Sequence, residues 1–231
     1  MRHIPVSDTS EIPVLSLEEA LKPTGSDYDR TRWIYVPDHY SEYRYILGTR
    51  GEKPLICIGV NPSTAVPGML DNTLKSAERI ALANGFDSFV MMNIYAQRAT
   101  SPDDMDRNLN PYLHQENMKA FRWLLSRIPS PPVLWAAWGS VIEKRAYLPG
   151  CVLDMAAVGQ EYQARWVTAG PRSKAGHPHH PLYLKKDSVL DLFPDLEQYL
   201  HFLEAGKTQL SRRLQPAFPD KKGDNWNAES L

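Results

Sequence analysis

Three short, uninterrupted apolar runs constrain the fold of this chain more than any other feature. They are PLICIGV (residues 54–60), FVMMNIY (89–95) and PVLWAAWG (132–139). Runs of this length, bounded by proline, glycine or polar residues, are typical of strands that are buried on both faces of a parallel sheet. The chain therefore contains at least three strands at the centre of a sheet.

Helical spacing fills the segments between these runs. Apolar residues at positions 74, 77, 80 and 81 predict a helix over 73–84, capped by Asp71 or Thr73 and ended by Gly85. Asn110-Pro111 offers a cap and a first-turn proline for a second helix that ends before Pro129. Its apolar stripe consists of Leu113, Phe121, Leu124, Leu125 and Ile128. Alternating strands and helices predict an α/β domain with a mostly parallel central sheet and helices on both faces.

The remaining patterns predict the edges of the domain. We expect a strand over 43–47, closed by Gly48 and Gly51, and another over 162–170. Residues 151–159 are predicted as a further strand that pairs with 162–170. Residues 140–148 predict a short helix, and a last helix is expected after Pro194. The predicted organisation is an N-terminal arm (1–30), a single α/β domain (31–205) and a polar C-terminal tail (206–231).

Composition excludes several classes of protein. Lysine and arginine total 26 against 27 aspartate and glutamate residues, so contact with nucleic acid would need a local basic patch. The two cysteines, Cys57 and Cys151, lie in apolar surroundings without metal-ligand spacing. The N-terminus has no apolar stretch typical of a signal peptide, and no run of 18 apolar residues occurs. We therefore expect a cytoplasmic protein without a membrane partner. The sequence does not indicate its oligomeric state.

A long loop follows the first apolar run. The stretch GVNPSTAVPGMLDNT (59–73) is longer than a connection between a strand and a helix requires. Asn61 could orient a water or pair with an amide-bearing ligand, or it could only bind loop backbone. Ligands of open α/β sheets lie outside the carboxyl ends of the strands, which is where this loop is expected. Candidate binding residues of the loop are Pro62, Ser63, Thr64 and Asp71.

Further polar residues follow the other strands. Asn93 lies inside an apolar run and must find partners, either as a clamp on the loop or as part of the site. Arg98 suits a phosphate or carboxylate, although Asp103, Asp104 and Asp106 could pair with it. Additional candidates at the strand ends are Tyr95, Trp138 and Gly139.

The segment AGPRSKAGHPHHPLYL (169–184) is the other dense polar feature. It places Arg172 and Lys174 close in sequence to His177, His179 and His180. No cysteine or carboxylate lies within the loop to complete a metal site, and no cofactor is predicted. A single imidazole that donates a hydrogen bond or carries a proton is the preferred interpretation.

Together these motifs are identified as those of an uncharacterised bacterial and phage family, domain of unknown function sixteen-forty-three. The resemblance covers about residues 43–184 and rests on NPSTA, NIYAQRAT, WG and HPLYL in this order.

A more remote resemblance links the chain to the uracil-DNA glycosylase superfamily. Gly59-Val60-Asn61-Pro62 is similar to that family's G-x-[DN]-P motif, and His177-Pro178 or His180-Pro181 is similar to its histidine-proline loop. The resemblance implies a three-layer α/β fold, with Asn61 holding the attacking water and His180 or His177 donating to the departing base. Tyr95 or Trp138 would stack on the base, and Pro181 would belong to the loop.

We therefore predict hydrolysis of the N-glycosidic bond of a nucleobase in DNA or in a nucleotide. Two alternatives stay open. The first is a non-catalytic module that binds a nucleobase or nucleotide in the same pocket. The second is a metal-dependent phosphoesterase built on the histidine cluster.

Overall fold

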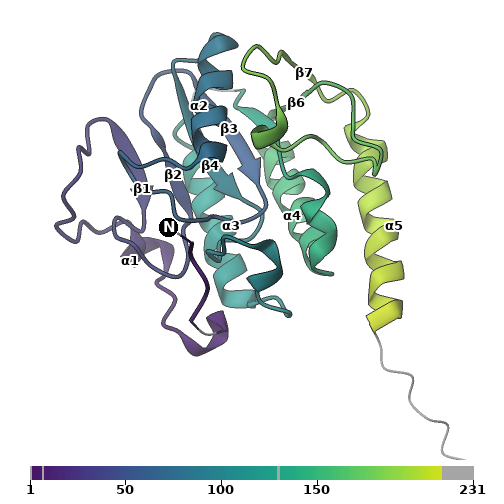
Figure 1. Ribbon diagram of the computed structural model, residues 1–231, viewed down its shortest axis with the longest axis horizontal. Helices are drawn as coiled ribbons and strands as arrows, with labels where there is room; N and C mark the ends of the chain where they lie inside the picture. The colour runs from purple at the N-terminus through teal and green to yellow at the C-terminus, as the bar shows by residue number, and fades with distance from the viewer. Residues whose placement is uncertain (1, 7, 129–130, 215–231) are drawn as a thin grey trace, which may run out of the picture.

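The structure is a computed structural model that describes residues 2–6, 8–128 and 131–214. A seven-stranded sheet with the strand order β1-β2-β4-β3-β5-β6-β7 forms its centre (Figure 1). Its strands are β1 (Trp33–Val36), β2 (Ile46–Thr49), β3 (Pro54–Gly59), β4 (Ser88–Asn93), β5 (Val133–Ala136), β6 (Arg165–Ala169) and β7 (Leu190–Leu192). β4, β3, β5 and β6 are parallel, and the strands outside them are antiparallel to their neighbours. The predicted mixed α/β fold is confirmed.

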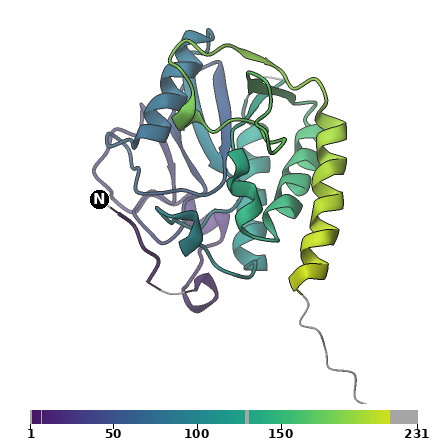
Figure 2. The ribbon, with the colours of Figure 1, turned by 45° about the vertical axis from the view of Figure 1, so that its right-hand side comes forward.

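Helices cover both faces of the sheet (Figures 1 and 2). α2 (Asn72–Ala83) packs on one face through Leu74, Ala77 and Ile80. The opposite face is covered by α1 (Leu17–Ala20), α3 (Pro111–Leu125), α4 (Leu148–Glu161) and α5 (Leu196–Leu214). The described residues also form four short 3₁₀ helices, namely η1 (Thr9–Glu11), η2 (Pro102–Asp104), η3 (Gly139–Lys144) and η4 (Pro181–Tyr183).

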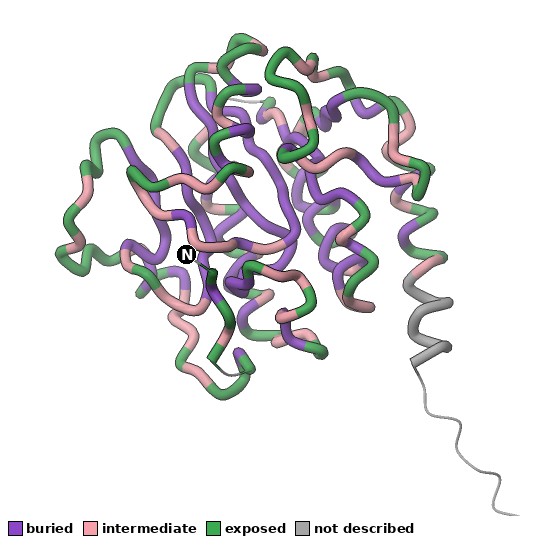
Figure 3. Tube along the Cα trace, viewed as in Figure 1, coloured by how far each residue is buried: buried purple, intermediate pink, exposed green. Residues whose placement is uncertain are grey.

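The predicted central elements match the structure closely. All six residues of β3 and all six of β4 are buried, as expected of strands covered on both faces (Figure 3). Asp71 caps α2 by accepting a hydrogen bond from the Leu74 backbone N–H at 2.9 Å, and Asn110 caps α3. Gly85 follows the C-cap of α2 with φ of +78°, a backbone conformation that favours glycine.

Two predicted strands differ from the structure. Residues 151–159 are not a strand but part of α4, because a predominantly apolar run does not by itself distinguish a strand from a helix. The segment predicted as a strand over 43–47 is paired in β2 only from Ile46, and Gly48 lies inside the strand instead of closing it. A Cβ at Gly48 would lie 2.3 Å from the Phe89 carbonyl oxygen, so the close approach of β4 requires glycine there.

The two ends of the chain also depart from the predicted pattern. The segment predicted as a loosely packed arm contains α1, whose Leu17 and Ala20 are buried in the core. At the other end, α5 continues beyond the predicted start of a polar tail and ends at Leu214. The remainder of that predicted tail, 215–231, lies outside the described residues. In the described part of the chain, none of the helices has the length and apolar character needed to cross a membrane.

Candidate functional site

The connections between the parallel strands run in opposite directions on the two sides of β3, so the strand order reverses between β3 and β5. From β3 the chain passes through α2 to β4 on one side, and from β4 it passes through α3 back across β3 to β5 on the other. Ligands of open α/β sheets bind at such a switch point, outside the carboxyl ends of the strands. The fold therefore selects the loops that follow β3, β4, β5 and β6.

A cavity of about 480 Å³ lies at this position. Its lining comes from the loop after β3 and the start of α2, the end of β4, the segment before β2, η3, and the loop after β6. These residues are Val60, Asn61, Pro62, Ser63, Thr64, Asp71, Asn72, Thr73, Leu74, Met91, Asn93, Ala99, Thr100, Pro102, Arg44, Val141, His180, Leu182 and Tyr183. Predicted site residues from three separate stretches of sequence thus share one cavity.

Asn61 joins the loop after β3 to the loop after β4. Its Nδ2 donates hydrogen bonds to the backbone oxygens of Ala99 at 2.7 Å and Pro62 at 3.1 Å. Its Oδ1 has no hydrogen-bond partner among the described residues and is available to a water or a ligand. Asn61 therefore both fixes the loop and presents an acceptor.

Asn93 is buried at the end of β4, with 1% of its surface exposed. In the described part of the chain neither its Oδ1 nor its Nδ2 has a partner. A Cβ at Gly59 would lie 2.5 Å from the Met91 methyl carbon and 3.1 Å from Asn93 Oδ1, so the glycine of the GVNP motif provides the space for this amide. Because neither polar atom of the Asn93 side chain binds the loop, the side chain is not a clamp on it. The backbone oxygen of Asn93 accepts a hydrogen bond from Asn117 Nδ2.

His180 closes the opposite side of the cavity. Burial lowers its pKa, against an opposing effect of the Asp71 carboxylate, so the imidazole is neutral at pH 7. Its Nδ1 accepts a hydrogen bond from the Leu182 backbone N–H at 3.3 Å. A neutral ring that accepts at Nδ1 carries its proton on Nε2, which makes Nε2–H a donor.

Gly139 packs closely against His180. Its φ is +62°, and a Cβ at this position would lie 3.2 Å from the His180 Cβ. The predicted residue is therefore placed beside the site, although it does not line the cavity. The buried Pro181 directly follows His180 and begins η4.

Arg44 was not among the predicted residues, yet it lies at the floor of the cavity with no exposed surface. Its Nη1 donates to the Ala65 backbone oxygen at 3.1 Å, whereas its Nε and Nη2 have no partner in the described part of the chain. Burial lowers its pKa to about 9, and the positive charge of Arg98 adds to this effect. A lone charge within the aromatic and apolar run 43–47 was the available sequence signal.

Arg98 supports the cavity loop from behind. Its guanidinium donates to the backbone oxygens of Ser63 and Ala65 and to the Tyr35 hydroxyl, and it stacks on the Tyr40 ring with 4.3 Å to the centroid. Burial lowers the pKa of this arginine too. The three aspartates that could have paired with it bind elsewhere: Asp103 to Lys144, Asp104 to Arg2, and Asp106 to Tyr95 and Gln97.

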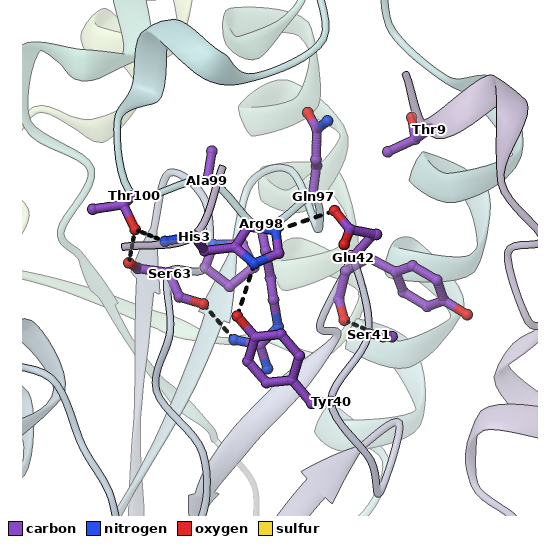
Figure 4. A network of polar contacts seen from close by, with 12 residues as sticks. His3, Thr9, Tyr40, Ser41, Glu42, Ser63, Gln97, Arg98, Ala99 and Thr100 are labelled. Carbon is purple, nitrogen blue, oxygen red and sulfur yellow. Dashed lines mark hydrogen bonds and ion pairs between the residues drawn. The ribbon is translucent and has the colours of Figure 1, made fainter. Parts of the chain in front are cut away.

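A polar network fixes the outer wall of the loop (Figure 4). Ser63 Oγ lies 3.1 Å from Thr100 Oγ1, which also accepts a hydrogen bond from the His3 backbone N–H. The His3 ring in turn bridges Tyr40 and Glu42. Beyond this wall a second hollow, of about 980 Å³, shares Thr64, Asp71 and Asn72 with the cavity and includes Arg2 and Lys75 in its lining.

Other predicted site residues lie outside the cavity. His177 is buried between the Tyr199 hydroxyl at 3.0 Å and Glu143 Oε1 at 2.9 Å, so its ring is not available as the donor to a base. Trp138 donates to the same Tyr199 hydroxyl, and Tyr95 binds Asp106. Both rings are fully buried and do not line the cavity, so neither offers a stacking surface there. Arg172 forms an ion pair with Asp195, and Lys174 is exposed.

The histidines of the 169–184 loop do not gather into a metal site. Among the described residues no three histidine, cysteine, aspartate or glutamate side chains are placed to hold a metal ion. The two cysteines are buried, and burial raises the pKa of the Cys57 thiol. The metal-dependent alternative therefore finds no ligand set in the described part of the chain.

Comparison with known proteins identifies one family. The model of the family described as "Protein of unknown function (DUF1643)" matches residues 44–182, which include Arg44, Asn61, Asn93 and His180. No curated protein and no solved structure matches the chain. The chain belongs to the DUF1643 family, whose description names no activity.

Proposed function

For this member of the DUF1643 family, we propose hydrolysis of the N-glycosidic bond of a nucleobase, with a site similar to that of uracil-DNA glycosylases. One observation carries the proposal: Asn61 and His180, which lie 119 positions apart in the sequence (180 minus 61), line the same cavity with the unpartnered amide of Asn93. The cavity volume of about 480 Å³ falls within the roughly 300–1,000 Å³ range of small-molecule sites.

The chemistry of the reaction matches these groups. Cleavage of the bond places positive charge on the sugar and negative charge on the departing base. A hydrogen-bond donor that is already oriented lowers the free energy of such an anion in the transition state. In the proposal, His180 Nε2–H donates to the base, and Asn61 Oδ1 orients the attacking water.

Asn93 would recognise the base. An amide side chain offers one donor and one acceptor side by side, and this arrangement pairs with the edge of a nucleobase. A buried amide without partners costs free energy, which a base that supplies both missing hydrogen bonds would offset. Asn93 therefore supports a base in preference to an apolar ligand.

Two exposed apolar side chains next to His180 would suit contact with a polynucleotide. Leu182 is 44% exposed and Tyr183 is 81% exposed, and both line the cavity next to His180. Large apolar side chains at the rim of a base pocket can stack on the bases that remain when one nucleotide leaves the helix. This feature favours a base within a polynucleotide as the substrate.

A non-catalytic binding module is the second candidate, and the engaged amide of Asn61 favours it. Because Asn61 Nδ2 binds two backbone oxygens, the residue has a role in loop structure that needs no catalysis. In that case the same cavity would bind a base without cleaving the glycosidic bond.

An assay of base release distinguishes the two candidates. Single-stranded and duplex oligonucleotides, each with one uracil, hypoxanthine or xanthine, are incubated with the protein, and free base is measured by liquid chromatography and mass spectrometry. We expect release by the wild type and a fall of about 10²–10³-fold in kcat for Asn61→Ala and for His180→Phe. His179→Gln is the matched control, since His179 neighbours His180 in sequence but does not line the cavity.

Release that survives in both cavity variants would overturn the catalytic assignment. Binding of an oligonucleotide without release, lost in His180→Phe but not in His179→Gln, would establish the binding module instead. If the protein neither binds an oligonucleotide with any of these bases nor releases the base, both candidates are removed.

A further inference from the structure

Two buried arginines carry positive charge at one end of the cavity: Arg44 lines the cavity, and Arg98 lies behind the cavity loop. Arg44 and Arg98 both have no exposed surface, and both donate to the Ala65 backbone oxygen. Within the described residues neither guanidinium forms an ion pair; their hydrogen-bond partners are backbone oxygens and the Tyr35 hydroxyl, and Arg98 also stacks on the Tyr40 ring. A buried charge without a partner of opposite charge is costly, and such charges are normally paired.

Asp71 offsets only part of this charge. Among the described residues that line the cavity it is the single carboxylate, and its Oδ1 is occupied by the capping hydrogen bond to Leu74. It lies beyond ion-pair distance of Arg44 and Arg98, although its charge acts on both. Asp71 therefore does not pair with Arg44, and Arg98 behind the loop adds further positive charge near the Arg44 end of the cavity.

The free edge of Arg44 has a specific shape. The donors without partners are Nε and Nη2, while Nη1 is occupied. The Nε–H and one Nη2–H of a guanidinium point in the same direction and form a fork of two parallel donors. Such a fork binds two oxygens of one phosphate or carboxylate group at the same time.

The strand order places this fork at one end of the cavity. Arg44 precedes β2, and His180 lies against Gly139, which follows β5, so β4 and β3 lie between these two positions. Asn93 at the end of β4 and Asn61 after β3 therefore occupy the middle. The first turn of α2, a helix of 12 residues, lines the cavity as well, and its backbone N–H groups and dipole favour negative charge.

We propose that the Arg44 end of the cavity is an oxyanion subsite, and that the ligand is a nucleotide whose phosphate binds Arg44 while its base lies toward His180. The base part of this inference rests on the proposed function, whereas the oxyanion subsite rests on Arg44 alone. A phosphate could come from a nucleoside monophosphate or from a phosphodiester of a polynucleotide, and both present the two oxygens that the fork requires.

Isothermal titration calorimetry on matched ligands tests the subsite. Wild type and Arg44→Met are titrated with deoxyuridine, deoxyguanosine, their 5′-monophosphates and the dinucleotides d(UpU) and d(GpG). We expect at least one monophosphate or dinucleotide to bind the wild type at least ~30-fold more tightly than its nucleoside, and Arg44→Met to remove this preference. The better of the two phosphate ligands identifies the source of the phosphate.

Arg44→Lys provides a second variant that retains the charge but not the fork. We expect it to fold and to keep only part of the preference for phosphate. Equal affinity of the wild type for nucleoside and nucleotide would overturn the subsite and leave the nucleobase proposal in place. An unchanged preference in both Arg44 variants would also overturn it.

Inorganic phosphate separates the subsite from the proposed function. If no nucleoside or nucleotide binds, but phosphate raises the Tm of the wild type and not that of Arg44→Met, the nucleobase proposal fails and the oxyanion subsite is supported. If phosphate changes neither Tm and no ligand binds, both fail. A dicarboxylate such as succinate that raises the Tm more than phosphate does would reassign the subsite to carboxylate ligands.

Discussion

Two buried polar regions of this protein differ in how completely their groups are paired. In the first, Asp106 accepts hydrogen bonds from Thr9, from the Tyr95 hydroxyl at 3.0 Å and from Gln97 Nε2 at 2.7 Å. Its backbone N–H donates to Gln97 Oε1 at 2.7 Å. These hydrogen bonds join the N-terminal arm to the loop after β4, and the side chains of this region are hydrogen-bonded to one another.

The second region is the cavity floor. Arg44 and Asn93 are as deeply buried as Asp106, at 0%, 1% and 6% exposure. Yet the Arg44 Nε and Nη2 and both polar atoms of the Asn93 amide have no partner among the described residues. Equal burial with unequal pairing separates two kinds of buried polar group: one that stabilises the fold, and one that an external ligand would complete.

The largest expected effect is on the paired region. Asp106→Ala removes the acceptor of the Thr9, Tyr95 and Gln97 donors and leaves these groups buried without partners. We expect the free energy of unfolding to fall by about 3 kcal/mol or more. Urea denaturation followed by circular dichroism measures this change. A loss below about 1 kcal/mol would show that pairing at Asp106 contributes little and would break the comparison.

Arg44→Met should act in the opposite direction. The substitution removes a buried charge, and the Ala65 backbone oxygen keeps its hydrogen bond from Arg98. We expect the free energy of unfolding to rise by about 1–3 kcal/mol at pH 7, since apolar groups that replace buried charges often stabilise a protein. The same urea denaturation applies.

The pH dependence of this gain provides its control. The pKa of Arg44 is lowered to about 9 in the folded protein, so above that pH the unfolded state binds more protons than the folded state. Wild-type stability should therefore rise relative to Arg44→Met as pH increases through 9, and the advantage of the variant should shrink. An advantage that stays constant from pH 7 to pH 10 would contradict the buried-charge explanation.

The central fold could be predicted because its signals are local. The buried runs that form β3 and β4, the Asp71 cap and the Asn110 cap each depend on a few adjacent residues. The strand predicted over 151–159 was wrong because the segment has a single polar residue, the exposed Asp154, and one such residue is too few to show helical periodicity in the sequence. The prediction that Gly48 closes a strand was wrong for a different reason. Glycine is required there by the close approach of β4, and the neighbouring sequence does not show that contact.

The sequence selected some residues of the candidate site and missed others. Motifs selected Asn61 and His180, the end of a strand selected Asn93, and the structure places all three in the lining of one cavity. The choice between His177 and His180 depended on Tyr199 and Glu143, which reach His177 from α5 and η3. Arg44 was not predicted because it is distinguished by the partners that its Nε and Nη2 lack among the described residues, and sequence spacing does not report the absence of a partner.

Gly139→Ala sharpens the comparison at the His180 end of the cavity. The residue has a φ of +62°, and the added Cβ would lie 3.2 Å from the His180 Cβ. We expect a loss of about 1 kcal/mol in the free energy of unfolding and a weaker ligand affinity, because His180 must move. Gly68→Ala is the matched control, since it has a φ of +76° with nothing within 4 Å of the added Cβ. If both variants lose the same affinity for the nucleotide that the wild type binds in calorimetry, the close packing of Gly139 against His180 does not explain the loss.

The smallest effect concerns the protonation of His180. Because burial lowers its pKa below the ordinary value of 6.5, the unfolded state binds more protons once the pH falls below that value. Wild-type stability should therefore decrease relative to His180→Gln between pH 6.5 and pH 5, by less than about 1 kcal/mol, while the two proteins should respond alike to pH above 7. Thermal unfolding of both proteins across this range measures the difference. His179→Gln keeps His180 and should follow the wild type. A stability difference between wild type and His180→Gln that grows in favour of the wild type at low pH would show that His180 gains an acidic partner, and the neutral donor required at this end of the cavity would be lost.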